Sequence, residues 1–214
     1  SVGSGRSAAS LRAELDALLK ITESLRKTLA LDEILPQVLE SLFTIFRSAD
    51  RGFIVLKNDD GTLSPRWVKV RNVEGNYEPQ ISRTIINQVM ESKQAVLSAD
   101  AADDARFQDS ESLNLNPIRS VMCAPLTDAD GNSFGVLQVD TVNYRGWFRE
   151  EDIHVLFAVA TQASVAIENA RLHEKALQQR AIERDLELAD QIQRSFLPTR
   201  PPDVPGCRFF DYYQ

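Results

Sequence analysis

The sequence has little of what would make a disulfide-bonded, membrane-spanning or nucleic-acid-binding protein. Only two cysteines, Cys123 and Cys207, occur among 214 residues, which predicts no disulfide framework and a reducing, cytoplasmic location. No run approaches the roughly 20 apolar residues that cross a bilayer, so we expect no membrane partner. Residues 1–10 lack the basic and apolar regions of a secretory signal. The net charge of -7 argues against a nucleic-acid partner, which would require clustered Lys and Arg.

A catalytic or metal-binding constellation is also missing from the sequence. His154 and His173 are the only histidines, and neither has a cysteine or second histidine at metal-ligand spacing. A surface position is the expectation for both, with a haem ligand as the open alternative. No glycine-rich phosphate loop is present and no spacing pairs two carboxylates. We therefore expect no catalytic residue, metal or cofactor in this chain, and Cys123 reads as an apolar filler of a buried strand.

Two helices are predicted at the start of the chain. Leucines at 11, 15, 18, 25 and 29 follow steps of four and three, with Thr22 at the missing step, and such a seam is typical of helix pairing. Leu15, Leu18 and Leu25 are therefore candidates for a dimer contact. The second helix is expected to start at Asp32 as its N-cap, with Pro36 in the first turns, where a missing N–H costs least.

The middle of the chain predicts a sheet. Strand-like runs occupy residues 51–57, 63–70, 119–126 and 133–142, and the turns "NDDG" and "TDADGN" join neighbouring runs. A helix over residues 83–93 lies between them, with Ser82 as cap and Ile81 and Ile86 as a hydrophobic staple. The strands are apolar on both faces, so we expect helices to cover one face and loops closing a cavity to cover the other. This predicts an α+β fold around a central antiparallel sheet.

A single long helix is predicted from residue 150 to about 196, where Pro and Gly are absent. Its apolar series steps by four and three, is interrupted at Glu174, and has a five-residue step from Leu177 to Ile182, which locally changes coiled-coil winding. A helix of about 45 residues spans about 65 Å, more than a small domain. Its later turns are expected to pair with the same helix of a second subunit, parallel pairing being favoured over antiparallel. The predicted dimer and signalling positions are Ile167, Leu177, Ile182, Leu186 and Phe196.

The segments "IRSVMCAPL", "GVLQVD" and "FREED…VLFAVATQASVAIENARL", in this order, resemble the GAF family of cytoplasmic sensor domains. The resemblance covers about residues 31–172 and implies a small-molecule cavity over one face of the sheet, used to detect a ligand or to dimerise. The implied organisation is an N-terminal tail and amphipathic helix (1–30), the GAF domain (31–172), a coiled-coil signalling helix (173–197) and a proline-rich linker with the start of a truncated phosphatase domain (198–214).

A ligand pocket on the sheet face would have an anion anchor and a stacking surface. Arg119 could bind an anionic ligand and Trp67 could stack on a ring. Alternatively, Trp67 fills the core and Arg119 pairs with the acidic loop at Asp103 and Asp104. The complete candidate set is Phe53, Trp67, Ile85, Val89, Arg119, Met122 and Asp140.

Two known activities of GAF domains match this sequence poorly. Members that bind cyclic nucleotides carry an Asn-Lys pair, a Phe and an Asp-Glu pair; Asn143, Phe148 and Asp152 match, but Tyr144 and Ile153 replace the Lys and the Glu. We favour a turn residue, a core plug and a helix-start carboxylate for the three matches. Members that reduce methionine sulfoxide need several cysteines, and only Cys123 lies within the predicted domain.

The tail "ERDLELADQIQRSFLPTRPPDVPGCRFFDYYQ" resembles the segment that joins a sensor domain to a SpoIIE-like phosphatase of the metal-dependent PPM class. The matching residues are Glu187, Leu188, Ile192, Gln193, Leu197, Pro198, Pro202, Pro205 and Gly206. That class binds Mn²⁺ or Mg²⁺ through aspartates beyond Gln214, so metal and phosphoprotein substrate are expected only for a full-length parent. The expectation is a homodimeric bacterial control domain of the kind that regulates sigma factors. A ligand-free dimerisation or partner-docking module is the alternative.

Overall fold

The computed structural model describes residues 23, 30–71, 81–98, 118–142, 147–196 and 206. The elements in chain order are α2 (Leu31–Ile45), β1 (Arg51–Lys57), β2 (Leu63–Val70), α3 (Arg83–Ser92), β3 (Val96–Ser98), β4 (Ser120–Thr127), β5 (Ser133–Thr141) and α5 (Glu150–Ser195). The chain forms two compact units, one ending at Arg171 and one beginning at Leu172. The predicted leucine seam with Leu15, Leu18 and Leu25 lies outside the described residues, as do the acidic segment 99–117 and most of the proline-rich tail.

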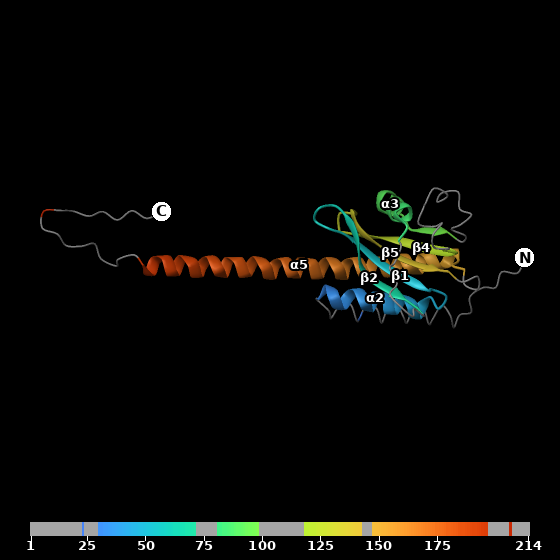
Figure 1. The fold of residues 1–214 in the computed structure, drawn as a ribbon, viewed down its shortest axis with the longest axis horizontal. Helices are drawn as coiled ribbons and strands as arrows, with labels where there is room; N and C mark the ends of the chain where they lie inside the picture. The colour runs from blue at the N-terminus through green and yellow to red at the C-terminus, as the bar shows by residue number, and fades with distance from the viewer. Residues whose placement is uncertain are drawn as a thin grey trace, which may run out of the picture. The chain divides into compact units, whose positions relative to one another are not determined.

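The five strands form one antiparallel sheet in the order β2-β1-β5-β4-β3 (Figure 1). Strand β1 pairs with β2 and β5, and β4 pairs with β5 and β3. Both predicted hairpin turns are present, and each places a glycine in the left-handed region, Gly61 at φ 85° and Gly131 at φ 77°. The α+β fold with a central antiparallel sheet is thereby confirmed. The short edge strand β3 was not predicted, because three residues show no alternation.

The two faces of the sheet carry separate apolar clusters. The first contains the side chains of α2 and α5 with Ile54, Leu56, Met122, Leu137 and Val139 of the strands. The second contains Ile85, Ile86 and Val89 of α3 with Phe53, Val55, Val121, Cys123 and Val136. Figure 1 shows α3 on one side of the sheet and α2 and α5 on the other. Both faces are covered, as predicted, but the expectation that helices cover only one face was wrong, because α3 covers the second.

The starts of α2 and α3 differ in detail from the expected caps. Helix α2 has Ala30 as its N-cap, so the expected cap Asp32 lies instead in the first turn beside Glu33, where acidic side chains interact favourably with the helix dipole. Ser82 is the N-cap of α3, as predicted, but its side chain makes no capping hydrogen bond. Ile86 is buried and Ile81 packs against the same cluster, so the predicted staple pair shares one apolar layer.

Helix α5 changes its surroundings near residue 171. Its apolar positions Leu156, Ala160, Ala163, Ile167 and Ala170 are buried in the first cluster. Beyond Arg171 the large apolar side chains are exposed. The prediction that Ile167 belongs to the dimer seam was wrong, because Ile167 is fully buried inside its own unit. The four-three series is thus part of the domain core as far as Ala170.

Helix α5 contains an 18-residue stretch that is long and apolar enough to cross a membrane, with a mean hydropathy of 1.2. The sequence itself shows no run of about 20 apolar residues at this place, because polar side chains interrupt the helix. Within the structure 44% of that stretch is buried, and its buried residues are those that pack on the sheet. A core helix satisfies the same criteria, so this stretch agrees with the packing of α5 against the sheet.

Candidate functional site: a buried polar cluster on the α3 face

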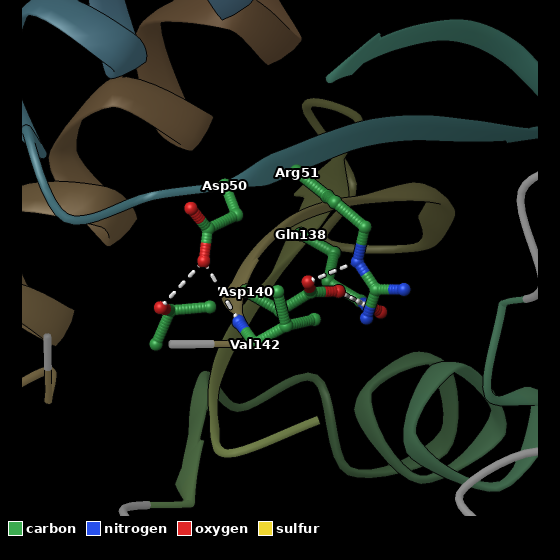
Figure 2. A network of polar contacts seen from close by, with 6 residues as sticks. Asp50, Arg51, Gln138, Asp140 and Val142 are labelled. Carbon is green, nitrogen blue, oxygen red and sulfur yellow. Dashed lines mark hydrogen bonds and ion pairs between the residues drawn. The ribbon is translucent and has the colours of Figure 1, made fainter. Parts of the chain in front are cut away.

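Three polar side chains, Arg51, Gln138 and Asp140, are buried together on the α3 face of the sheet (Figure 2). Arg51 is the cross-strand partner of Asp140, and Gln138 lies between its partners Phe53 and Cys123. Side chains of directly opposed residues share a face, so the three lie in the layer that contains Phe53 and Cys123. Arg51 is 3% exposed and the other two are 0% exposed. We call these three residues the polar cluster.

The Asp140 carboxylate is the centre of the polar cluster. Arg51 Nε donates a hydrogen bond to Asp140 Oδ1 at 2.5 Å, and Gln138 Nε2 donates to Asp140 Oδ2 at 3.2 Å. Both carboxylate oxygens are therefore engaged. The Arg51 guanidinium carbon also lies 6.0 Å from the centroid of the Phe53 ring, within the range of a cation–π contact.

Burial sets the electrostatics of this site. Loss of hydration raises the pKa of the Asp140 carboxyl, and the charge and hydrogen bond of Arg51 oppose that rise. A buried ion pair costs several kcal/mol of desolvation per ion, which mutual attraction repays only in part. An apolar replacement of the pair would cost less to bury. The burial of this ion pair is therefore weak evidence of a contribution to stability.

One side-chain atom of Gln138, the carbonyl oxygen Oε1, accepts no hydrogen bond from the described residues around it. Its amide nitrogen is engaged with Asp140, but its buried carbonyl oxygen Oε1 has no hydrogen-bond partner within the described part of the chain. Buried side-chain acceptors are normally satisfied by protein or water. Leaving one unsatisfied costs about 1–3 kcal/mol. Gln138 Oε1 is therefore the one acceptor of the polar cluster that no described residue satisfies.

A second set of hydrogen bonds joins the polar cluster to the end of β5. The Asp50 carboxylate accepts hydrogen bonds from Thr141 Oγ1 and from the Val142 backbone N–H, both at 2.8 Å (Figure 2). The Asp50 N–H donates to the carbonyl oxygen of Asp140 at 3.0 Å. Asp50, the residue before β1, is thus fixed to the end of β5 and to Val142, next to Arg51 and Asp140.

The start of α5 is fixed to the sheet in a similar way. The Arg149 N–H donates to Asp152 Oδ2 at 2.8 Å, and the Phe148 N–H donates to Ser120 Oγ at 3.3 Å. Phe148 is buried and meets Phe46 edge to face, with ring centroids 6.0 Å apart. Phe148 and Asp152 therefore act as core plug and helix-start carboxylate, as predicted. Asn143 and Tyr144 lie outside the described residues.

The predicted pocket residues separate into two groups. Phe53, Ile85 and Val89 meet in the second apolar cluster, and Asp140 lies on the same face. Met122 belongs to the opposite face with α2 and α5, and Trp67 is opposite Ile54 on edge strand β2 and 38% exposed. Placing Met122 and Trp67 with the other candidates was therefore wrong. The error arose because the sequence does not fix which face each side chain of an all-apolar strand occupies.

Arg119 lies immediately before β4, and its backbone N–H donates to the carbonyl oxygen of Thr141 at 2.9 Å. It is partly buried. The basic side chain of the buried cluster is Arg51, which the sequence reasoning missed. A charged residue at the head of a wholly apolar strand, and a glutamine inside the run "GVLQVD", were the available signals.

No group of three potential metal ligands occurs among the described residues. Cys123 is fully buried, and burial raises the pKa of its thiol. A thiol that resists ionisation is a poor nucleophile. Cys123 therefore serves as an apolar filler of β4, in agreement with its predicted role.

The comparisons with known proteins agree with this architecture. No curated protein matches the chain. Among solved structures, free methionine-R-sulfoxide reductase from Neisseria meningitidis aligns with TM-score 0.61 at 18% identity, over 81% of this chain and 98% of that one. The GAF domain of an Acinetobacter phosphoenolpyruvate-protein phosphotransferase aligns with TM-score 0.59 at 19% identity, over 76% and 98%. Part of a methyl-accepting chemotaxis protein aligns with TM-score 0.54 at 23% identity, over 71% and 97%.

At these identities the structural likenesses establish the fold alone. The family comparison is more direct, because the GAF domain family matches residues 28–168. That range includes the entire sheet, α3 and most of the buried part of α5. The chain belongs to the GAF domain family.

Proposed function

We propose that this chain is the dimeric sensory module of a signalling serine/threonine phosphatase, and that it passes ligand or partner binding through α5 to a PPM-type catalytic domain. Membership of the GAF family supports the sensory and regulatory part of this function. The phosphatase part is supported by the tail motif that includes Leu197, Pro198 and Gly206. The observation that carries the proposal is α5 itself, 46 residues that continue from the GAF unit past residue 171.

Exposed apolar side chains beyond residue 171 support dimerisation. Each of these residues is at least half exposed: Leu172, Leu177, Ile182, Leu186, Leu188, Ile192 and Phe196. A solitary helix with so much exposed apolar surface is unusual in a soluble protein. The same helix of a second copy would cover this surface in a coiled coil. Parallel pairing would bring the two copies' C-terminal segments, and hence two catalytic domains, together.

The hydrogen bonds around Asp50 support a route from the α3 face to α5. Binding next to the polar cluster would displace β5 at Gln138 and Asp140, and Asp50 links that region to Thr141 and Val142. Residues 147–149 follow a few positions later and enter α5 through the Arg149–Asp152 hydrogen bond. A shift at the end of β5 would therefore reach the first turn of α5. The five-residue step from Leu177 to Ile182 supplies a helix pair that can switch between two registers.

The proposal is tested in the full-length parent by inserting two alanines after Gln179, which restores an unbroken seven-residue step between Leu177 and the residue now numbered Ile182. Phosphate release from a phosphoserine peptide is measured with and without the upstream stimulus. We expect the insertion to remove the response while leaving basal phosphatase activity. The control carries Gln178→Ala and Gln179→Ala without a change of length, and should respond like the parent. A normal response in the insertion variant would contradict the proposal.

A further inference from the structure

We propose that Asp130, in the turn between β4 and β5, is a site of spontaneous backbone modification, at which the aspartate converts through a cyclic succinimide to isoaspartate. The sequence contains two Asp-Gly dipeptides, Asp60-Gly61 and Asp130-Gly131. Glycine after aspartate favours this reaction, because it has no Cβ to hinder attack by its backbone nitrogen. The hydrogen bonds of the two turns differ, and that difference selects Asp130.

The reaction needs no partner other than water. The backbone nitrogen of the glycine attacks the side-chain carboxyl carbon of the aspartate. A C–N bond forms, a C–O bond breaks, and the proton of the nitrogen leaves with the hydroxyl as water. Water then opens the ring at either carbonyl, which restores aspartate or leaves isoaspartate, whose main chain is longer by one carbon. No oxidation or reduction takes place.

The two dipeptides occupy equivalent places in two hairpin turns. In each turn the carbonyl oxygen of the first residue, Asn58 or Asp128, accepts the glycine N–H at 3.0 Å. Both glycines are in the left-handed region, at φ 85° and 77°, and both aspartates before them are exposed to water. The same hydrogen bond has to open in either turn before the nitrogen can attack. A difference in rate must therefore come from the carboxyl group.

The carboxylate of Asp60 is held by Thr62, the residue that ends its turn. Asp60 Oδ1 accepts a hydrogen bond from the Thr62 backbone N–H at 2.8 Å and another from Thr62 Oγ1 at 2.6 Å. These bonds lower the pKa of Asp60. An ionised carboxylate is a poor electrophile, because it has no hydroxyl that can leave as water. The two bonds also restrict the rotation of the side chain, which ring closure requires.

Asp130 lacks these two bonds. In its turn Asp128 holds the last residue instead: Asp128 Oδ1 accepts the Asn132 N–H at 2.7 Å, and Asp128 Oδ2 accepts a hydrogen bond from Asn132 Nδ2 at 3.2 Å. The Asp130 carboxylate accepts no hydrogen bond from any residue that the structure describes. The side-chain hydrogen bonds of the two turns thus protect Asp60 and leave Asp130 reactive.

Modification at residue 130 affects a turn that lies against α5. The additional main-chain carbon falls between Asp128 and Asn132, which close the turn through a backbone hydrogen bond at 3.0 Å. Thr127, the preceding residue, donates its N–H to Ser164 Oγ of α5 at 3.0 Å. Isoaspartate at this place should therefore lower the thermal unfolding midpoint of the GAF unit.

The test follows the purified chain during incubation at neutral pH in water enriched in ¹⁸O. Each ring opening adds one ¹⁸O atom, and peptide mapping with electron-transfer fragmentation distinguishes aspartate from isoaspartate at each site. We expect Asp130 to take up ¹⁸O and form isoaspartate about tenfold faster than Asp60. In urea, where neither turn is formed, the two sites should react at similar rates.

Exchange of side chains between the turns tests the cause. Asp128→Asn with Asn132→Thr gives the second turn the side-chain pair of the first, and should slow the reaction at Asp130 about tenfold. Thr62→Val removes only the hydroxyl and should accelerate the reaction at Asp60 about threefold. Asn132→Thr alone provides the same readout if the double variant does not fold, which circular dichroism shows.

Four results would overturn the proposal. Asp60 could react as fast as Asp130 in the folded chain, or neither site could react in the folded chain while both react in urea. Asp130 could keep the same advantage in urea, which would assign it to the local sequence and not to the fold. Finally, the exchange variant could leave the rate at Asp130 unchanged, which would exclude the side-chain hydrogen bonds as its cause.

Discussion

The GAF unit and the part of α5 beyond residue 171 contain similar apolar side chains in opposite environments. Ile167 is fully buried against the sheet, whereas Ile182, fifteen residues later on the same helix, is 61% exposed. Burying an isoleucine stabilises a fold by about 1.5–3 kcal/mol, so the first contributes to the stability of the unit and the second does not. The same helix therefore contributes to a core before residue 171 and exposes apolar side chains after it. Substitutions in the first part should change stability, and those in the second should change association.

The largest loss of stability is expected from breaking the polar cluster in the GAF unit. Arg51→Met leaves the Asp140 carboxylate buried without its ion-pair partner, which should lower the free energy of unfolding by about 3–5 kcal/mol. Urea denaturation followed by tryptophan fluorescence measures this loss. The double variant Arg51→Met with Asp140→Leu should recover much of it, since no unpaired charge remains. A double variant no more stable than Arg51→Met would contradict the desolvation argument.

Ile167→Ala should lower the free energy of unfolding by about 2–5 kcal/mol, because it opens a cavity between α5 and the sheet. The same urea titration measures it. Association should be unchanged, as Ile167 does not reach the surface. If Ile167→Ala instead weakened association and left stability intact, Ile167 would belong to the dimer seam after all.

A smaller loss is expected at the start of α5. Asp152→Ala removes the acceptor of the Arg149 N–H and should cost about 0.5–2 kcal/mol. Asp152→Asn keeps an acceptor oxygen and serves as the matched control, with most of the stability retained. Thermal unfolding by circular dichroism distinguishes the two. Equal losses in both variants would mean that the carboxylate charge, and not the capping hydrogen bond, provides the stability.

Leu177→Ala should change the stability of the GAF unit by less than about 0.5 kcal/mol, because its side chain is already 51% exposed. Its effect should appear in the dissociation constant of the dimer, measured by sedimentation equilibrium. A loss of unit stability as large as that of Ile167→Ala would remove the distinction between the two parts of the helix.

The sequence predicted the order of the main elements because each carries a strong local signal. The turns around Gly61 and Gly131, the long run without Pro or Gly before residue 196, and Ser82 all specify local structure. What it could not predict depends on tertiary contacts. Ile167 and Leu177 belong to one four-three series that only Glu174 interrupts, so the spacing alone could not show that Ile167 is core and Leu177 is exposed.

The candidate site was predicted only in part for a related reason. Phe53, Ile85, Val89 and Asp140 share the α3 face, but Met122 and Trp67 do not. In a strand that is apolar on both faces, polar and apolar residues do not alternate, so the sequence does not show which side chains share a face. Only the register with neighbouring strands assigns each side chain to a face. Arg51 and Gln138 were missed because neither residue type, considered singly, predicts a buried position.

The separation of the two parts of α5 is tested most directly by sedimentation equilibrium of the chain and of the double variant Ile182→Asp with Leu186→Asp. We predict a dimer for the unaltered chain and a monomer for the variant. At a lower concentration, where both proteins are monomeric, the GAF unit of the variant should unfold at the same midpoint temperature as that of the unaltered chain. A monomeric parent chain, or a variant that remains dimeric, would contradict the account.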